Sequence, residues 1–341
     1  MRSLLRPAAG FTCVFALATA GCSAGPKQTA AASPSATSYA SSSATADVSS
    51  SATSYAPYVS ATEASANDSS GSPSTYNLAF VISDGNDCTP RWNGEDAIAD
   101  TAVKSRISRL TADGGTVRVS FGGASGKELA ATCESVSKLA AAYGTALDAA
   151  GSSQADFDIE GDELTDADTV SLRSEAIAAL QKERPDLEVS FTLPVMPSGL
   201  DSDSLALLES ANTYDVQVAT VNLMTMNYGE SYAGDMGDYA LTSARAAHTQ
   251  LRKVFGLSAA GAWHGMALTS MIGVNDVAGE TFALSDAAQV RTFAEEKEIA
   301  WVSMWSTFRD QQCAKGSGTD AATDCSGVKQ SSGAFGEALA G

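Results

Sequence analysis

Five residues in the middle of the chain, Asp156-Phe157-Asp158-Ile159-Glu160, alternate acidic and apolar side chains. Because side chains along a β-strand point to opposite faces in turn, the three carboxylates would share one face. Carboxylates that close repel each other, so at least one is expected to hold a proton near neutral pH. The pattern therefore indicates either acid chemistry or an edge strand with a solvated acidic face.

The composition limits the binding partners. The chain has 341 residues, 44% of them hydrophobic, which suffices for one large core or two modest ones. Asp and Glu number 40 against 21 Lys and Arg, a formal net charge of −19. Nucleic-acid binding rests on cations that neutralise phosphates, so this acidity argues against nucleic acid and also disfavours anionic membranes. A neutral polysaccharide carries no such penalty.

Residues 1–21 have the pattern of a signal peptide. Arg2 and Arg6 flank a charged region, and the apolar run Phe11–Leu17 is too short to span a bilayer. Ala18-Thr19-Ala20 fits a signal-peptidase site. Ala20-Gly21-Cys22-Ser23 resembles a bacterial lipobox, although Leu is usual where Thr19 stands.

We favour the lipobox, because a lone Cys at that place has no other explanation. Cys22 would then be lipidated and anchor the chain to a membrane; free secretion is the alternative. Both interpretations predict an exported, extracellular protein.

A stretch rich in Ser, Ala and Thr follows. Residues 28–75 contain no Lys or Arg, and Ser-Ala-Thr-Ser-Tyr-Ala occurs twice, from Ser35 and from Ser51. This composition predicts a flexible, low-complexity tether, since it cannot bury enough apolar surface to offset the entropy of folding. We set a disordered linker at 22–50 and a single domain at 51–341.

Export places the cysteines of the mature chain in an oxidising compartment. Cys13 leaves with the signal peptide and Cys22 would be lipidated, so four cysteines remain, and four allow three pairings. Cys313 and Cys325 bracket a short loop and should pair, which leaves Cys88 and Cys133 for a second disulfide. No metal site or cofactor is expected, because the chain has two histidines and no Cys-x-x-Cys.

Short apolar runs alternate with helical patterns from Tyr76 onward. A helix is predicted over Leu129–Leu147, and a later one is predicted to stop at Pro185. The predicted strands are Asn77–Ile82, Thr116–Phe121, Asp156–Glu160, Leu187–Leu193, Val216–Met226, Met266–Ile272 and Ala300–Trp305.

Repeated β-α units predict an α/β fold with a parallel sheet, either doubly wound or closed into a (β/α)8 TIM barrel. Polar residues follow many of the strands, as at Ser83-Asp84 and Asn275-Asp276, which favours the barrel, whose enzymes build their sites at that rim. The eighth strand would be Tyr55–Val59, and Ser60–Thr75 after it is a poor helix.

Five motifs in order, over roughly residues 54–330, resemble those of bacterial chitinases of glycoside hydrolase family 18. The first is a Ser-x-Gly-Gly motif at Ser120-Phe121-Gly122-Gly123. The others are Asp156–Glu160, Met224-Thr225-Met226-Asn227-Tyr228-Gly229, Met271-Ile272-Gly273-Val274-Asn275-Asp276 and Trp305-Ser306. Three positions depart from the family pattern: Ser153 and Asn227 stand for Asp, and Phe308 stands for Asn.

The resemblance implies a substrate-assisted retaining mechanism. Glu160 would be the general acid, and the substrate's own acetamido oxygen would be the nucleophile. Asp158 would bind the acetamido N–H, and Asp156 would sit behind it and share a proton, so that the trio titrates as a unit. Tyr228 would donate to the acetamido carbonyl.

The resemblance also implies sugar contacts. Trp305 would form the floor of the sugar site, with Met226 packed beneath the sugar and Asn227 beside it. Trp92 would line an outer subsite or anchor a loop. We also place Ser120, Gly122 and Gly123 at the substrate site, the two glycines because they let the backbone approach closely.

The expected function is thus a chitinase that hydrolyses β-1,4-linked N-acetylglucosamine polymers, acting as a monomer. Two alternatives share the acidic motif. One is an endo-β-N-acetylglucosaminidase that acts on N-glycans, and the other is a non-catalytic sugar-binding surface protein. The binding protein is disfavoured because such relatives typically lose the acid, and Glu160 is present.

Overall fold

The computed structural model describes residues 53–314 and 324–341. The chain divides into two units, residues 1–47 and 48–341, and the described residues all belong to the second. The signal peptide, the lipidation of Cys22 and the linker at 22–50 lie outside the described residues. Within the described ranges, no helix is both long and apolar enough to cross a membrane.

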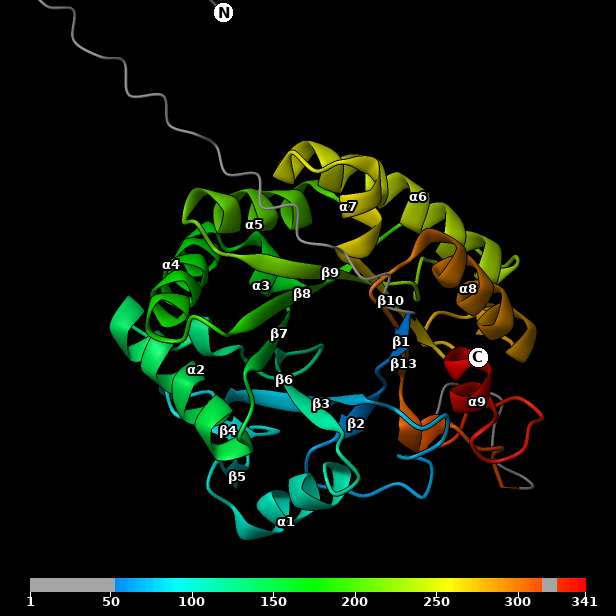
Figure 1. Cartoon of the computed structure of the whole chain (residues 1–341), viewed down its shortest axis with the longest axis horizontal. Helices are drawn as coiled ribbons and strands as arrows, with labels where there is room; N and C mark the ends of the chain where they lie inside the picture. The colour runs from blue at the N-terminus through cyan, green and yellow to red at the C-terminus, as the bar shows by residue number, and fades with distance from the viewer. Residues whose placement is uncertain (1–52, 315–323) are drawn as a thin grey trace, which may run out of the picture. The chain divides into compact units, whose positions relative to one another are not determined.

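Seven parallel strands lie side by side and are ringed by helices (Figure 1). Their β-branched and aromatic residues favour extended backbone. In order around the sheet they are β3 (Thr75–Ser83), β6 (Thr116–Gly122), β7 (Gln154–Asp158), β8 (Glu188–Pro194), β9 (Val218–Met224), β10 (Met266–Met271) and β13 (Trp301–Trp305). All seven predicted strands are present, but Glu160 lies just beyond the end of β7.

The eighth strand position is filled by two short strands on either side of Ala56-Pro57. β1 (Ser54–Tyr55) pairs with β13, and β2 (Tyr58–Ser60) pairs with β3, so this segment completes the (β/α)8 barrel. The prediction of a strand here is confirmed.

The expectation that the tether runs on to residue 75 is wrong. Residues 53–75 are folded against the barrel, and Asn67 and Asp68 are buried. The Arg106 guanidinium donates to the Ser60 carbonyl and to Asp68, and Asn67 donates to the Asp310 carbonyl. Backbone pairing and these polar contacts hold a segment whose composition offers little apolar surface.

Helices cover the outside of the barrel. Six connect successive strands: α1 (Thr101–Leu110), α2 (Val136–Ala150), α4 (Ala167–Glu183), α5 (Ser202–Thr213), α6 (Met236–Phe255) and α8 (Leu284–Lys297). Five begin after a side chain that accepts hydrogen bonds from the first turn: Asp100, Ser135, Asp166, Asp201 and Asp235.

The predicted helix over Leu129–Leu147 begins later than expected. A 3₁₀ turn, η1 (Leu129–Ala131), comes first, and α2 starts at Val136 because Ser135 caps it. The second 3₁₀ turn is η2 (Thr307–Arg309). The remaining elements are α3 (Asp162–Thr165), α7 (Ala259–His264), α9 (Ala334–Ala340), β4 (Pro90–Trp92), β5 (Asp96–Ala97), β11 (Gly273–Val274) and β12 (Thr281–Phe282).

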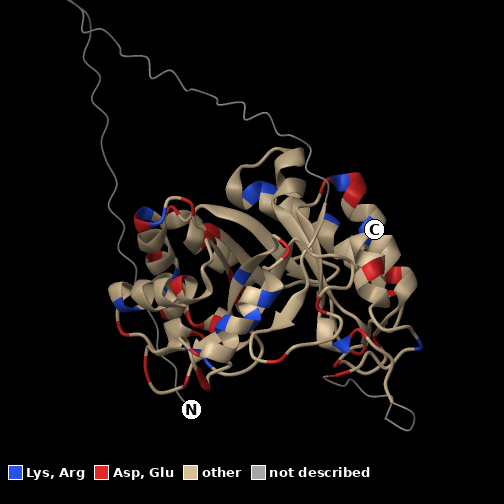
Figure 2. Cartoon of the chain, turned by 60° about the horizontal axis from the view of Figure 1, so that its bottom comes forward, with Lys and Arg blue, Asp and Glu red and all other residues tan. Residues whose placement is uncertain are grey.

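The two faces of the barrel strands carry different side chains. Phe121, Phe157 and Phe191 point outward, where Tyr143 of α2 packs edge-on against the first two. Aromatic contacts of this kind add to apolar burial in fixing the helix on the sheet. The charged residues lie mainly on the outer helices and loops (Figure 2). The inward face is polar and carries Asp156 and Asp158 of β7.

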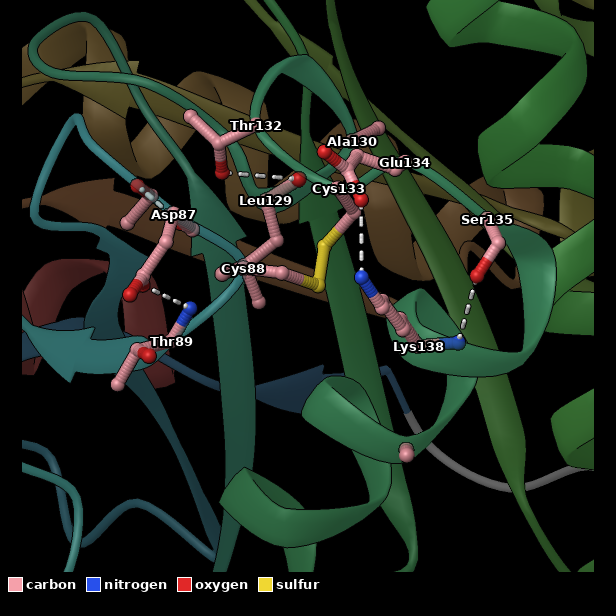
Figure 3. Close-up of a disulfide and its surroundings, with 12 residues drawn as sticks. Asp87, Cys88, Thr89, Leu129, Ala130, Thr132, Cys133, Glu134, Ser135 and Lys138 are labelled. Atoms are coloured by element: carbon pink, nitrogen blue, oxygen red, sulfur yellow. Dashed lines mark hydrogen bonds and ion pairs between the residues drawn. A yellow bond between two sulfur atoms is a disulfide. The ribbon is translucent and has the colours of Figure 1, made fainter.

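Both predicted disulfides are present. Cys88, in the loop between β3 and β4, is bonded to Cys133, which precedes α2 (Figure 3). Beside Cys88, the Thr89 backbone amide donates to the Asp87 side chain. Beside Cys133, Lys138 and Glu134 form an ion pair. Cys313 is bonded to Cys325. The first bridge ties together two loops that follow neighbouring strands of the barrel.

Candidate active site

A cavity of about 310 Å³ opens at the carboxyl ends of the strands. This is the rim at which barrel enzymes place their sites. Its walls combine aromatic rings, methionines, hydroxyls and carboxylates, and none of the lining residues is Lys or Arg. They are Tyr58, Phe80, Ile82, Asn93, Ala124, Ser125, Asp158, Glu160, Thr192, Met224, Met226, Asn227, Thr269, Met271, Asp276 and Trp305.

Asp158 and Glu160 form a hydrogen-bonded pair in this cavity, with Asp158 as the donor. Burial, with the nearby Glu160 and Asp156 carboxylates, raises the pKa of Asp158 well above its usual value. Burial also raises the pKa of Glu160, against the hydrogen bond from Asp158, and Asp276 adds to the rise. The pair therefore carries a proton at a pH where ordinary carboxyl groups are ionised.

Asp156 lies deeper in the barrel and is almost fully buried. Tyr58 and Ser120 donate to its Oδ2 at 2.9 and 2.7 Å, and Ser190 and Thr192 donate to its Oδ1, each at 2.8 Å. Four hydroxyl donors match an ionised carboxylate, which only accepts.

That the three acids titrate as a unit stays a prediction. In the structure Asp158 contacts Glu160, while Asp156 is held by hydroxyl groups. Ser120, predicted at the substrate site, does not line the cavity and instead holds Asp156 from below.

The hydroxyl groups around Asp156 belong to a wider network. Asn222 of β9 donates to Thr192 at 2.9 Å, and its own carbonyl accepts from Thr269 of β10 at 2.9 Å. Hydrogen bonds thus run from β7 through β8 and β9 to β10 across the barrel interior. A connected network of this kind fixes side-chain orientations, because each group has its partner.

Gly122 and Gly123 position the backbone of Asp158. Both have positive φ, 97° and 93°, a region that favours glycine. The Gly123 amide donates to the Asp158 carbonyl at 2.9 Å, and a Cβ on Gly122 would collide with the same carbonyl. A Cβ on Gly123 would meet the Phe80 ring at 2.8 Å. The two glycines therefore hold the strand end that carries the acids.

Trp305 lies at the end of β13 and forms an aromatic wall of the cavity. Its ring stacks on Phe80 with centroids 5.5 Å apart and an interplanar angle of 22°. Tyr58 and Phe308 meet it edge-on at 5.8 and 5.7 Å. Met226 also lines the cavity, so both predicted sugar contacts are at the site.

Asn227 and Asp276 hold each other at the mouth of the cavity. The Asn227 amide donates to the Asp276 carboxylate at 3.2 Å, and the Asp276 backbone N–H donates to the Asn227 carbonyl at 3.0 Å. Asn227 has a φ of 52°, which Asn tolerates better than most residues. The loop after β9 is also fixed by Glu280, which accepts from the Gly229 amide at 2.7 Å.

Two predicted site residues lie elsewhere. Tyr228 is buried against Tyr232 and Tyr239, does not line the cavity, and has a pKa raised chiefly by burial. Trp92 is fully buried in β4, and its indole N–H donates to the Ile98 carbonyl. Strand alternation alone would put Met226 and Tyr228 on one face, but β9 ends at Met224 and the left-handed backbone of Asn227 between them, with a φ of 52°, breaks the alternation. Trp92 is a structural anchor and not a subsite residue.

Several residues of the site were not singled out from the sequence. Tyr58 and Thr192 donate to Asp156, and Asn222 donates to Thr192. Phe80 and Asn93 line the cavity. Hydroxyl and amide groups on the inward face of a strand look like ordinary strand residues in a sequence, and only the position of Tyr58 in the predicted first strand offered a signal.

The sequence is similar to two curated proteins. It is 34% identical over 275 residues to a probable bifunctional chitinase/lysozyme of Escherichia coli (strain K12), and the match covers 75% of this chain. It is 33% identical over 274 residues to endochitinase 11 of Metarhizium anisopliae, again over 75% of the chain. The matches cover 31% and 52% of those two proteins. No protein-family model matches the sequence.

Solved structures agree with the sequence matches. The catalytic domain of a hyperthermophilic chitinase from Pyrococcus furiosus is 27% identical, has a TM-score of 0.73, and the match covers 84% of this chain and 93% of that one. The chain is thus similar in sequence and in fold to proteins named chitinase. A GH18 chitinase from Pseudoalteromonas aurantia, 16% identical with a TM-score of 0.54 over 74% of this chain and 94% of that one, shares the fold.

Proposed function

We propose that this protein is a chitinase that hydrolyses β-1,4-linked N-acetylglucosamine polymers. The observation that carries the proposal is the buried Asp158–Glu160 pair, which faces a cavity walled by Trp305 and free of lining cations, and burial raises the pKa of both acids. The sequence similarity to proteins named chitinase supports the same conclusion. Aromatic faces suit the C–H faces of sugar rings, and a neutral acetylated sugar suits an acidic pocket.

Glu160 would act as the general acid and protonate the glycosidic oxygen while the bond to the anomeric carbon breaks. The substrate's acetamido carbonyl oxygen would attack that carbon and form an oxazolinium ion. Water would then add to the same carbon, and Glu160 would take its proton. The proton that Asp158 shares with Glu160 would pass to Glu160 and from there to the glycosidic oxygen, which leaves Asp158 anionic, and burial raises the pKa of both groups.

Asp158 would bind the acetamido N–H and offset the positive charge of the oxazolinium ion. Its Oδ1 is buried at the cavity and has no hydrogen-bond partner among residues 53–314 and 324–341. A buried acceptor in that state favours a ligand that brings a donor. Tyr228 lies outside the cavity, so the donor to the acetamido carbonyl would come from the amide and hydroxyl groups that line it.

A second hollow supports a polymeric substrate. It has a volume of about 570 Å³, lies between residues 60–66 and Phe308, and shares Asn93 with the first cavity. The Phe308 ring meets Trp305 edge-on, so aromatic surface continues from one hollow to the other. A chain of several sugars would fill both hollows, whereas a single sugar would fill only the first.

The proposal includes export. Two disulfides in the described part of the chain suit an oxidising compartment. We propose that the chain leaves the cytoplasm by its N-terminal signal, is anchored through lipidated Cys22 and acts as a monomer. The mass of the mature N-terminus tests the anchoring, and sedimentation of the purified domain by analytical ultracentrifugation tests the oligomeric state.

The decisive experiment is hydrolysis of N-acetylglucosamine oligomers by the wild type and by Glu160→Gln. The variant should fold, bind the sugar and lose about 10²–10⁴-fold in rate. Glu134→Gln, at an exposed ion pair, is the control and should keep full activity. A Glu160→Gln enzyme with more than about a tenth of the wild-type rate would sink the assignment.

Product analysis separates the alternatives. A chitinase releases short N-acetylglucosamine oligomers from chitin, whereas an endo-β-N-acetylglucosaminidase releases glycans from a high-mannose glycoprotein. Substrate assistance predicts retention, inert fully deacetylated chains and inhibition by a thiazoline analogue. NMR of the first product would show the β-anomer; an α-anomer would exclude this mechanism.

A further inference from the structure

A buried cation lies beneath the acids in the barrel interior. Arg118 belongs to β6, is 8% exposed, and stands two residues before Ser120, so both side chains point inward. Its guanidinium donates to the side-chain amide oxygen of Asn77 at 2.7 Å and lies over the Trp301 ring, 4.0 Å from the centroid. Both partners are neutral.

Two further buried arginines, Arg106 and Arg173, each have a carboxylate partner. Arg106 is 3.0 Å from Asp68, and Arg173 is 3.0 Å from Glu128. Arg118 makes no ion pair within 4 Å among the described residues. Because a guanidinium stays protonated in proteins, its buried charge needs compensation from an anion farther away.

The register of the sheet identifies that anion. Ser120 of β6 pairs with Asp156 of β7, so Arg118 lies one inward position below Asp156 on the adjacent strand. Strand spacing and rise place the two Cα atoms about 8 Å apart. Burial lowers the pKa of Arg118, and Asp156 exerts the largest opposing attraction.

The other groups that face Asp156 are known. Tyr58 of β2, Ser120 of β6, and Ser190 and Thr192 of β8 contribute neutral hydroxyls. Asp158 on the same strand is an acid that repels it. Within the described interior of the barrel, Arg118 is thus the cation that acts on Asp156.

We propose that Arg118 is a positioning residue, a buried counter-cation that keeps Asp156 ionised and so confines the mobile proton to Asp158 and Glu160. The catalytic consequence rests on the proposed function, but the charge pairing does not. An ionised Asp156 repels the anionic form of Asp158 and makes it hold its proton. Loss of the cation would let Asp156 compete for that proton.

The test compares Arg118→Met, which removes the charge, with Arg118→Lys, which keeps it. Carboxyl ¹³C NMR titration of the folded protein, with Asp156 assigned from Asp156→Asn, measures the charge pairing without substrate. We expect the Asp156 midpoint and the acid limb of kcat/KM to move up by about one pH unit in Arg118→Met. In Arg118→Lys both should move by less than half as much.

Arg106→Met is the matched control, because it also removes a buried arginine but lies outside the barrel interior. It should lower the melting temperature and leave both titrations unchanged. If Arg118→Met does not fold, Arg118→Gln, which keeps a donor for Asn77, replaces it.

An unchanged Asp156 midpoint in a folded, uncharged variant overturns the proposal. So does an equal shift in Arg118→Lys, since the charge would then be irrelevant. A shifted Asp156 midpoint in a protein that does not hydrolyse N-acetylglucosamine oligomers would uphold the charge pairing and overturn the proposed function instead.

Discussion

The Tyr58 hydroxyl donates to the Asp156 carboxylate at 2.9 Å, although 98 residues separate them along the chain. This contact joins the strand that completes the barrel to the strand that carries the acids. It also connects the folding of the first strand to the charge state of the site, because Tyr58 is one of four donors that hold Asp156 as an anion.

Replacing Tyr58 by Phe should lower kcat by about 10- to 100-fold, since a buried hydrogen bond to a charged group contributes about 1.5–3 kcal/mol. Tyr143→Phe is a matched control, because Tyr143 donates to the buried Glu128 carboxylate at 2.6 Å, away from the cavity. Both variants should lose similar stability in urea unfolding. Equal losses of kcat would mean that Tyr58 has only a structural role.

Asp158→Asn should make the protein more stable at neutral pH while it abolishes most activity. The raised pKa of Asp158 means that the native state holds a proton that the unfolded state has released. Wild-type stability therefore falls as pH rises from about 4, the ordinary value, through the raised value. The amide that replaces the carboxyl group does not titrate, so the variant escapes this loss.

We expect Asp158→Asn to have a higher free energy of unfolding than the wild type at pH 7, and this gain to vanish near pH 3.5. Urea unfolding at both pH values measures it. The exposed Asp162→Asn should show no gain. A variant less stable than the wild type at pH 7 would contradict the raised pKa of Asp158 in the native state.

Asp276→Asn should move the basic limb of the kcat/KM profile to lower pH. Asp276 raises the pKa of Glu160, so removing its charge lets Glu160 lose the catalytic proton at a lower pH. The amide at position 276 can still contact Asn227, so the loop should stay in place. A basic limb that stays put, or moves to higher pH, would show that Glu160 does not respond to this charge.

The two disulfides should contribute unequally to stability. Cys88–Cys133 closes a loop of 45 residues and Cys313–Cys325 one of 12, and the longer loop restricts the unfolded chain more. Each double Cys→Ser variant should lose about 2–4 kcal/mol of unfolding free energy, with the larger loss at Cys88 and Cys133. Urea unfolding compares them directly, and a larger loss from the shorter loop would count against this account.

Some of this site was accessible from sequence because its information is local. The alternation of Asp156, Asp158 and Glu160 follows from the strand period, and Trp305 follows from its place at the end of an apolar run. Strand order was accessible for the same reason, since repeated β-α units allow few topologies.

The rest depends on contacts between strands. Nothing local distinguishes Thr192 or Asn222 from other polar strand residues, and their role appears only when the barrel places them around Asp156. Tyr228, predicted at the sugar site, does not line the cavity, because the chain leaves the regular strand after Met224 and Asn227 has a positive φ that the sequence does not reveal. Composition also misjudged residues 53–75, whose fold is held by backbone and polar contacts.

The placement of β1 has a consequence for the order of folding. The Ser54 amide donates to the Ala300 carbonyl, so the first strand of the domain meets its neighbour only after about 250 further residues exist. Until then two sheet edges stay unpaired, and an emerging chain cannot close prematurely. A polypeptide truncated before β13 would keep both edges open and would be prone to aggregate, so closure of the ring requires a chain that extends through β13.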